Sequence, residues 1–282
     1  MRRRWVVLGC ASISATTLTA CDKLFDLTPI PETPSDASRL DGIADIGAPG
    51  DAIAPCFLPR VLAPGITNGL DPQMRDDRLE VIYAKGPAGA YDLYHAKRSI
   101  PTSLFVETVL LNVNTVGNEE SDPALTLDGL LLIFKSNRGG TGQRIWQATR
   151  LSRDDDFTSA TQVQGIESVS PSGIDISPDG NTIYIDDGGA LLVARRASRD
   201  LPFDTLARTS IHFDYPTVTP NGLELFSNDG GVARFTRAVA SDTEPFVGTD
   251  VIDTGYDADV LPNNAAIIIN TSDGFYTRDR CN

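Results

Sequence analysis

Short apolar stretches that follow a turn dipeptide recur along the chain from residue 77 onward. Each copy begins with Asp or Asn, in three cases followed by Gly, and continues into a run of mostly apolar residues. The five copies are 77–83, 128–134, 179–185, 221–226 and 263–269, with steps of 51, 51, 42 and 42 residues between them. Asp-Gly and Asn-Gly supply the positive φ that a tight hairpin needs, so each copy predicts strand, turn, strand.

A second repeat supports the first. Each unit continues into another apolar segment that ends in arginine, always five residues after an apolar position. The pairs are Leu93 with Arg98, Ile145 with Arg150, Leu191 with Arg196, Val232 with Arg237, and Phe275 with Arg280. We expect a repeated exposed arginine that bonds a neighbouring carbonyl or carboxylate. A cationic ring used for binding is the alternative.

Each arginine is followed by a candidate outer strand in the first four units. These candidates are 104–111, 161–163, 205–210 and 246–252. The units therefore contain four strands each, and helical periodicity is absent throughout. Repeats of about 40 to 50 residues built from four short strands predict the blades of an all-β, five-bladed propeller.

The turns carry a resemblance to a known family. Ser177-Pro178-Asp179-Gly180, Thr219-Pro220-Asn221-Gly222 and Leu127-Asp128-Gly129 resemble the S-P-D-G turn of TolB-type, WD40-like propeller repeats of bacterial envelope proteins. The resemblance spans 57–282 and is degraded in the first and last units. It implies a propeller that recognises a protein or peptide across the channel mouth.

The ends of this region predict how the ring closes. The last unit stops after its third strand, whereas 57–62 precedes the first unit as an isolated strand. We expect 57–62 to form the outer strand of the fifth blade, beside 275–277, because propellers protect their edges. Cys56 and Cys281 would then adjoin, and in an exported protein a disulfide is favoured over two free thiols.

The N-terminus predicts export. Three arginines and an apolar stretch precede Leu18-Thr19-Ala20-Cys21, which resembles the lipobox of bacterial lipoproteins. The apolar stretch is too short to span a membrane. We therefore expect residues 1–20 to be a cleaved signal peptide, Cys21 to be lipidated, and the acidic, proline-rich residues 21–55 to be a flexible tether.

Location and charge limit the partners. A lipidated Cys21 places the protein in the cell envelope, outside the cytoplasm, with the membrane leaflet left open. The net charge of −14, which becomes more negative when the leader is removed, disfavours nucleic acid and anionic lipid surfaces.

Counting back from each turn locates the innermost strand of each unit, which faces the central channel. Seven residues before the second turn residue stand Asp71, Asp122, Gly173, Tyr215 and Asp257, and five before it stand Gln73, Ala124, Asp175, Thr217 and Asp259. The five aspartates are candidates for a binding site at the channel mouth for a cation, an ammonium group or a basic peptide, or for acid/base chemistry. The interpretation we favour is structural, namely that they cap turns and accept backbone amides.

Enzymatic signatures are weak. The histidines are His95 and His212, no serine lies in a G-x-S-x-G elbow, and no Cys/His cluster has zinc spacing. We therefore predict no catalytic residue, metal or cofactor. We favour a non-enzymatic binding module that recognises an envelope protein or peptide on a face of the propeller. The alternatives are a carbohydrate-active hydrolase that uses Asp122, Asp175 and Asp257, and a propeller that binds a cation.

Overall fold

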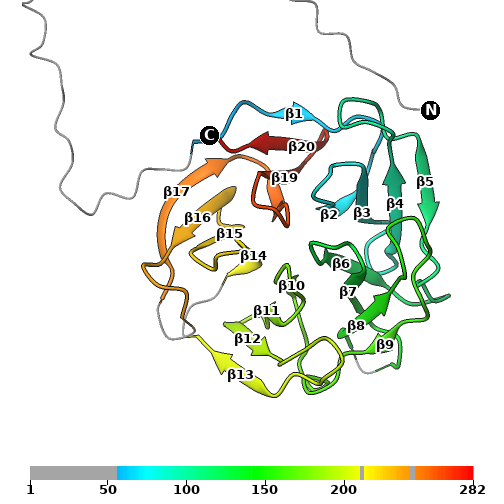
Figure 1. The fold of residues 1–282 in the computed structure, drawn as a ribbon, viewed down its shortest axis with the longest axis vertical. Helices are drawn as coiled ribbons and strands as arrows, with labels where there is room; N and C mark the ends of the chain where they lie inside the picture. Colours follow the sequence, from blue (N-terminus) through cyan, green and yellow to red (C-terminus); the bar gives the residue numbers. More distant parts are fainter. Residues whose placement is uncertain (1–55, 141, 210–212, 242–244, 282) are drawn as a thin grey trace, which may run out of the picture. The chain divides into compact units, whose positions relative to one another are not determined.

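The computed structural model describes residues 56–140, 142–209, 213–241 and 245–281. The predicted leader, Cys21 and the tether lie outside this part of the chain, as does His212. Within it, the strands form five antiparallel four-stranded sheets around a central axis (Figure 1). The predicted all-β, five-bladed propeller is confirmed.

The first four blades are continuous in sequence. Blade 1 is β2 (Leu70–Met74), β3 (Glu80–Lys85), β4 (Asp92–Lys97) and β5 (Glu107–Leu110); blade 2 is β6 (Glu120–Leu125), β7 (Leu131–Ser136), β8 (Arg144–Thr149) and β9 (Thr161–Gln162). Blade 3 is β10 (Gly173–Ile176), β11 (Thr182–Asp186), β12 (Leu191–Arg195) and β13 (Thr205–Arg208); blade 4 is β14 (Asp214–Val218), β15 (Glu224–Asn228), β16 (Val232–Thr236) and β17 (Val247–Asp253). Each blade runs from the axis outward.

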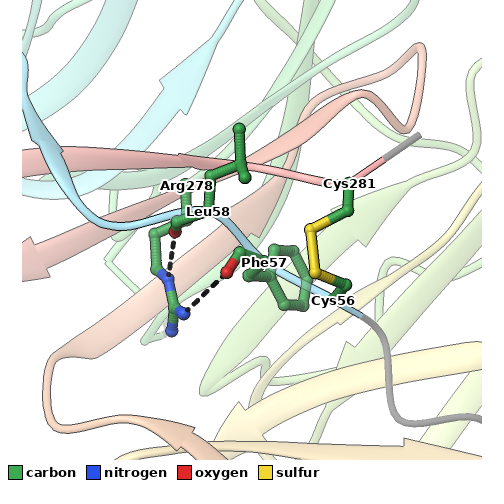
Figure 2. Close-up of a disulfide and its surroundings, with 5 residues drawn as sticks. All are labelled: Cys56, Phe57, Leu58, Arg278 and Cys281. Carbon is green, nitrogen blue, oxygen red and sulfur yellow. Dashed lines mark hydrogen bonds between the residues drawn. A yellow bond between two sulfur atoms is a disulfide. The ribbon is translucent and has the colours of Figure 1, made fainter. Parts of the chain in front are cut away.

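The fifth blade joins the two ends of the propeller. It contains β18 (Tyr256–Val260), β19 (Ala266–Thr271), β20 (Gly274–Asp279) and, on the outside, β1 (Val61–Leu62). Val61 pairs with Thr277 as predicted, and the Cys281 amide donates to the Cys56 carbonyl (2.9 Å). Cys56 and Cys281 form the predicted disulfide, with Cα atoms 5.2 Å apart (Figure 2).

A side chain reinforces this closure. Arg278 Nε donates to the Leu58 carbonyl (3.1 Å), and Nη2 donates to the Phe57 carbonyl (3.4 Å) (Figure 2). The N-terminal strand is thus held by backbone pairing, an arginine and a covalent bond.

Apolar side chains fill the seams between neighbouring blades. One cluster joins Ile82 and Leu93 of blade 1 to Leu132, Phe134 and Phe157 of blade 2, and each of the other four seams has its own cluster among the described residues. Burial of these strands on both faces explains why the copies are mostly apolar over consecutive positions rather than alternating.

The repeated arginines correct one expectation, because they are buried rather than exposed. Arg98, Arg150, Arg196 and Arg237 are each at most 9% exposed, and Arg280 is half-buried. In those first four the Nε atom donates to the carbonyl of the second turn residue, at 2.5 to 2.9 Å. The predicted bond to a carbonyl is therefore confirmed, in a buried setting.

Each of these guanidinium groups also lies over a phenylalanine ring. The pairs are Arg98 with Phe105, Arg150 with Phe157, Arg196 with Phe203, Arg237 with Phe246, and Arg280 with Phe57, at 4.3 to 5.1 Å from the ring centroid. In four blades the ring follows its arginine in sequence. In the fifth it comes from the N-terminal strand, so residue 57 completes the last repeat.

Candidate functional site at the mouth of the channel

The innermost strands place unusual backbone at the channel mouth. Four residues at this position have positive φ, between 46° and 53°: Asp71, Asp122, Tyr215 and Asp257. Each lies where the pairing with the next strand shifts register, as in a β-bulge. A left-handed tyrosine is rare, and such strained residues gather at functional sites.

Blade 3 differs from the other four at this position. Gly173 takes part in regular pairing with Asp186, without a register shift. A Cβ on Gly173 would lie 2.9 Å from the Tyr215 Cα, so a larger residue here would collide with the backbone of blade 4. Glycine therefore lets the backbone at Tyr215 of blade 4 approach blade 3 closely.

The carboxylates at the mouth bond from blade to blade. Asp71 Oδ2 accepts the Asp122 amide (3.1 Å), and Asp122 Oδ2 accepts the Ile174 amide (2.7 Å). Asp257 exchanges two hydrogen bonds with Asn228, both 2.9 Å. The structural role weighed from the sequence, acceptance of backbone amides, is thus present for Asp71 and Asp122.

A deeper layer repeats the arrangement. Gln73 Oε1 accepts the Leu125 amide (3.1 Å), and Asp175 Oδ2 accepts the Val218 amide (2.8 Å). Asp259 receives hydrogen bonds from Gln73 Nε2 (2.5 Å) and Thr217 Oγ1 (3.1 Å). These bonds join blade 1 to blades 2 and 5, and blade 4 to blades 3 and 5, so all five blades take part.

Lys135 supplies positive charge to this region. Its Nζ lies 3.4 Å from Asp122 Oδ2, donates to the Ser172 carbonyl and sits 5.4 Å from the centre of the Tyr215 ring. Among the described residues, no other lysine or arginine lies within ion-pair distance of the five channel aspartates. The channel therefore holds more acid than base.

Burial raises the pKa of every one of these acids: Asp71, Asp122, Asp175, Asp257 and Asp259. For Asp175 the pKa reaches about 7. Repulsion between neighbouring carboxylates adds to the effect of burial at Asp71 and Asp259. Burial lowers the pKa of Lys135, but Asp122 and Asp71 outweigh this and raise it above its ordinary value.

The space at the mouth is small. A cavity of about 30 Å³ is lined by four of the five predicted aspartates together with Tyr215 and Thr217. Such a volume holds one or two water molecules or the tip of a side chain, whereas small-molecule pockets begin near about 300 Å³. Asp175 lies deeper, beside Gln73 at a second cavity of about 10 Å³.

Sequence reasoning missed two polar side chains here, Lys135 and Asn228. Lys135 carried a signal, since it is a charged residue that directly follows the apolar run of 130–134. Asn228 carried none, because its meeting with Asp257 joins two blades.

The remaining candidates supply no alternative centre. His95 is buried and its Nδ1 lies 3.1 Å from Glu80 Oε1. No group of three or more His, Cys, Asp or Glu side chains in the described ranges is arranged to hold a metal ion. The same ranges contain no helix long and apolar enough to cross a membrane.

Fold and channel together define the chain as a five-bladed β-propeller with an acidic channel mouth. A gluconolactonase from Xanthomonas campestris is similar in structure, with 13% identity, a TM-score of 0.50, and coverage of 78% of this chain and 88% of that chain. The α-L-arabinofuranosidase PaAbf62A from Podospora anserina has 11% identity and a TM-score of 0.54, covering 81% and 95%. At such identities the likeness shows the fold alone.

TolB from Acinetobacter baumannii is also a structural neighbour, at 18% identity and a TM-score of 0.43, with coverage of 66% of this chain and 44% of that chain. A scan against protein-family models finds no match, and a search of curated proteins finds none either.

Proposed function

We propose that this protein is a non-enzymatic binding module of the cell envelope, anchored through a lipid on Cys21. Its propeller recognises a lysine or arginine side chain of an envelope protein or peptide at the channel mouth. The signal peptide, residues 1–20, and the tether, residues 21–55, belong to the proposal as they were expected from the sequence.

The imbalance of charge at the mouth carries this proposal. Asp71, Asp122 and Asp257 line one cavity, and the described residues set Lys135 alone against them as a cation. Buried carboxylates without matching cations are costly. An incoming ammonium or guanidinium group would relieve that cost, and the tip of such a side chain fits a cavity of about 30 Å³.

The same geometry weakens the hydrolase alternative. Glycoside hydrolysis needs two carboxyl groups about 5 to 10 Å apart that flank a bound sugar. Here Asp122 and Asp175 are engaged by backbone amides, and the space beside them is too small for a sugar ring.

Binding of blocked tripeptides tests the proposal. Ala-Lys-Ala and Ala-Arg-Ala, capped at both ends, should give saturable heats in calorimetry, while the norleucine analogue should give none. Asp257→Asn should weaken binding at least fivefold. Asp273→Asn is the matched control, since Asp273 is an exposed acid in the turn between β19 and β20, and it should bind like the parent.

Equal binding of the lysine and norleucine peptides, or none by either at millimolar concentration, would contradict recognition of a basic group. Calcium is titrated separately. Saturable heat with calcium but not with peptide would instead support the cation-binding alternative.

Anchoring has its own test. In bacteria that express the full chain, the parent should partition with membranes and carry labelled acyl chain, and Cys21→Ser should do neither. Recovery of Cys21→Ser in the membrane fraction would overturn the lipid anchor without affecting the channel site.

A further inference from the structure

Arg98 is a buried cation without a counter-ion. It is 9% exposed, its Nε donates to the Arg78 carbonyl (2.6 Å), and its Nη1 donates to the Ser103 carbonyl (3.4 Å). Its guanidinium carbon lies 4.3 Å from the centre of the Phe105 ring. No carboxylate of the described residues lies within ion-pair distance of Arg98, and Nη2 has no hydrogen-bond partner among them.

Two other seams show what is missing. In both, the repeated arginine of one blade faces the first residue of the second strand of the preceding blade. Arg150 meets Glu80 at 2.8 Å, and Arg280 meets Glu224 at 2.8 Å. Blade 5 has Ala266 at that position, which supplies no carboxylate for Arg98.

The surroundings of Arg98 add further positive charge. Arg78 is the nearby cation that, together with burial, lowers the pKa of Arg98. Arg78 itself pairs with Asp279 (2.6 Å), and Lys97 lies 3.8 Å from Glu80, a carboxylate that other cations already hold closely. An arginine so desolvated and uncompensated attracts an anion.

Arg98 lines a cleft of suitable size and chemistry. The cleft is about 540 Å³ and is bounded by Lys97, Arg98, Ser99, Ser103, Leu104 and Val106. Leu104 is 57% exposed and Val106 is 77% exposed, so the lining of the cleft includes apolar side chains that are open to solvent. Volumes of about 300 to 1,000 Å³ are typical of small-molecule sites.

We propose that this cleft binds an amphiphilic anion, that is, a carboxylate or phosphate head group carrying an alkyl chain. The head group pairs with Arg98 and Lys97, and the chain covers Leu104 and Val106. The overall charge of −14 repels anions in general, so burial of the alkyl chain supplies the added affinity that a simple anion lacks.

The cleft is independent of the channel mouth. Asp71 lies at the start of β2, whereas Lys97 ends β4, and antiparallel pairing puts these two residues at opposite ends of the strands of blade 1. A ligand at Arg98 therefore leaves the proposed peptide site untouched.

Calorimetry with decanoate and decyl phosphate, below their micelle concentrations, tests this inference on the parent protein. At least one of them should bind saturably and at least tenfold more tightly than decanol, and the stronger of the two identifies the head group. Equal binding by decanol, or no saturable binding by any of the three, would overturn the proposal.

Variants locate the site. Leu104→Asp should weaken decanoate binding at least tenfold, because it places a like charge beside the head group and removes an apolar contact. Leu201→Asp is the matched control, since Leu201 is 51% exposed in the corresponding loop of blade 3. Asp257→Asn should bind decanoate like the parent. Thermal unfolding checks that both aspartate variants are folded. An equal loss of decanoate affinity in Leu104→Asp and Leu201→Asp would refute the assignment.

Discussion

Acids buried in the seams and acids buried along the channel have opposite electrostatic surroundings. In the seam of blades 1 and 2, Glu80 contacts Arg150 (2.8 Å), Arg75 (3.1 Å) and His95 (3.1 Å). Burial alone would raise its pKa, but the hydrogen bonds from His95 and Arg150 lower it to about 2. Along the channel, burial raises the pKa values of five aspartates, and the charge on Lys135 opposes this at Asp71, Asp122 and Asp257.

The contrast separates two uses of a buried carboxylate. Glu80 is charged, fully paired and joins two blades, which is what a stabilising ion pair requires. The channel aspartates hold blades together by accepting hydrogen bonds from backbone amides, yet their ionisation opposes folding. A neutral side chain such as asparagine would serve the amides without that cost, so the excess acid favours a role in binding.

Removal of the disulfide should have the largest effect on stability. Replacing Cys56 and Cys281 with serine should lower the free energy of unfolding by about 5 kcal/mol, since the disulfide closes a loop across a separation of 225 residues. Urea denaturation of the parent and the double variant measures this. A loss below about 1 kcal/mol would mean that pairing of β1 with β20 and packing of the seams suffice to close the ring.

Removal of the charge on Glu80 should have the next largest effect. Glu80→Gln leaves Arg150 buried without a counter-ion and leaves Arg75 with Asp77 as its remaining carboxylate, which we expect to cost about 3 to 5 kcal/mol in urea denaturation. The matched channel variant is Asp71→Asn. It replaces an acid whose pKa is already raised well above its ordinary value, and it should change stability by no more than about 1 kcal/mol.

Similar losses from Glu80→Gln and Asp71→Asn would break the comparison, because the channel acid would then be as structural as the seam acid.

The strands, turns and closing edge could be predicted because they depend on local chemistry. Asp179-Gly180 marks a turn through its backbone preference, and the unpaired strand at 57–62 had a single vacant edge to fill. The seam partners could not be predicted from one blade. Arg150 and Glu80 are 70 residues apart and meet only because blades pack side by side.

One seam feature was nonetheless visible in the sequence. Phe105, Phe157 and Phe203 each follow their arginine by seven residues, whereas the ring under Arg280 is Phe57, which only the structure reveals. The candidate site was located by counting residues, but its bulges and its lysine depend on strand register, which hydrophobic pattern alone leaves open.

The stability contributions of the channel acid Asp175 and the seam acid Glu80 should change with pH in opposite directions. The pKa of Asp175 rises from 3.8 in the unfolded chain to about 7, so the folded state binds more protons between these values. Stability should therefore fall as pH rises from about 4 to about 7 and stay level above, by at most about 1.4 kcal/mol per pH unit for one carboxyl. Glu80 acts oppositely, and its contribution is lost as pH falls from about 4.5 towards about 2.

Asp175→Asn tests the channel part of this curve. Urea midpoints of the variant between pH 4 and pH 8 should slope less steeply than those of the parent. An unchanged slope would assign the pH dependence to other groups.

The stacked rings provide the finest test, because they compare a paired arginine with an unpaired one. Phe157 lies under Arg150, which Glu80 neutralises, whereas Phe105 lies under Arg98, which no described carboxylate neutralises. Both rings are at most 3% exposed, so leucine at either position loses similar packing. A desolvated cation gains more from an aromatic face than a neutralised one, by about 0.5 to 1 kcal/mol. Phe105→Leu should therefore destabilise more than Phe157→Leu by that difference in parallel urea titrations. Equal losses of unfolding free energy would mean that the rings act through packing alone. The presence or absence of a counter-ion, which distinguishes the seams from the channel, would then have no influence on them.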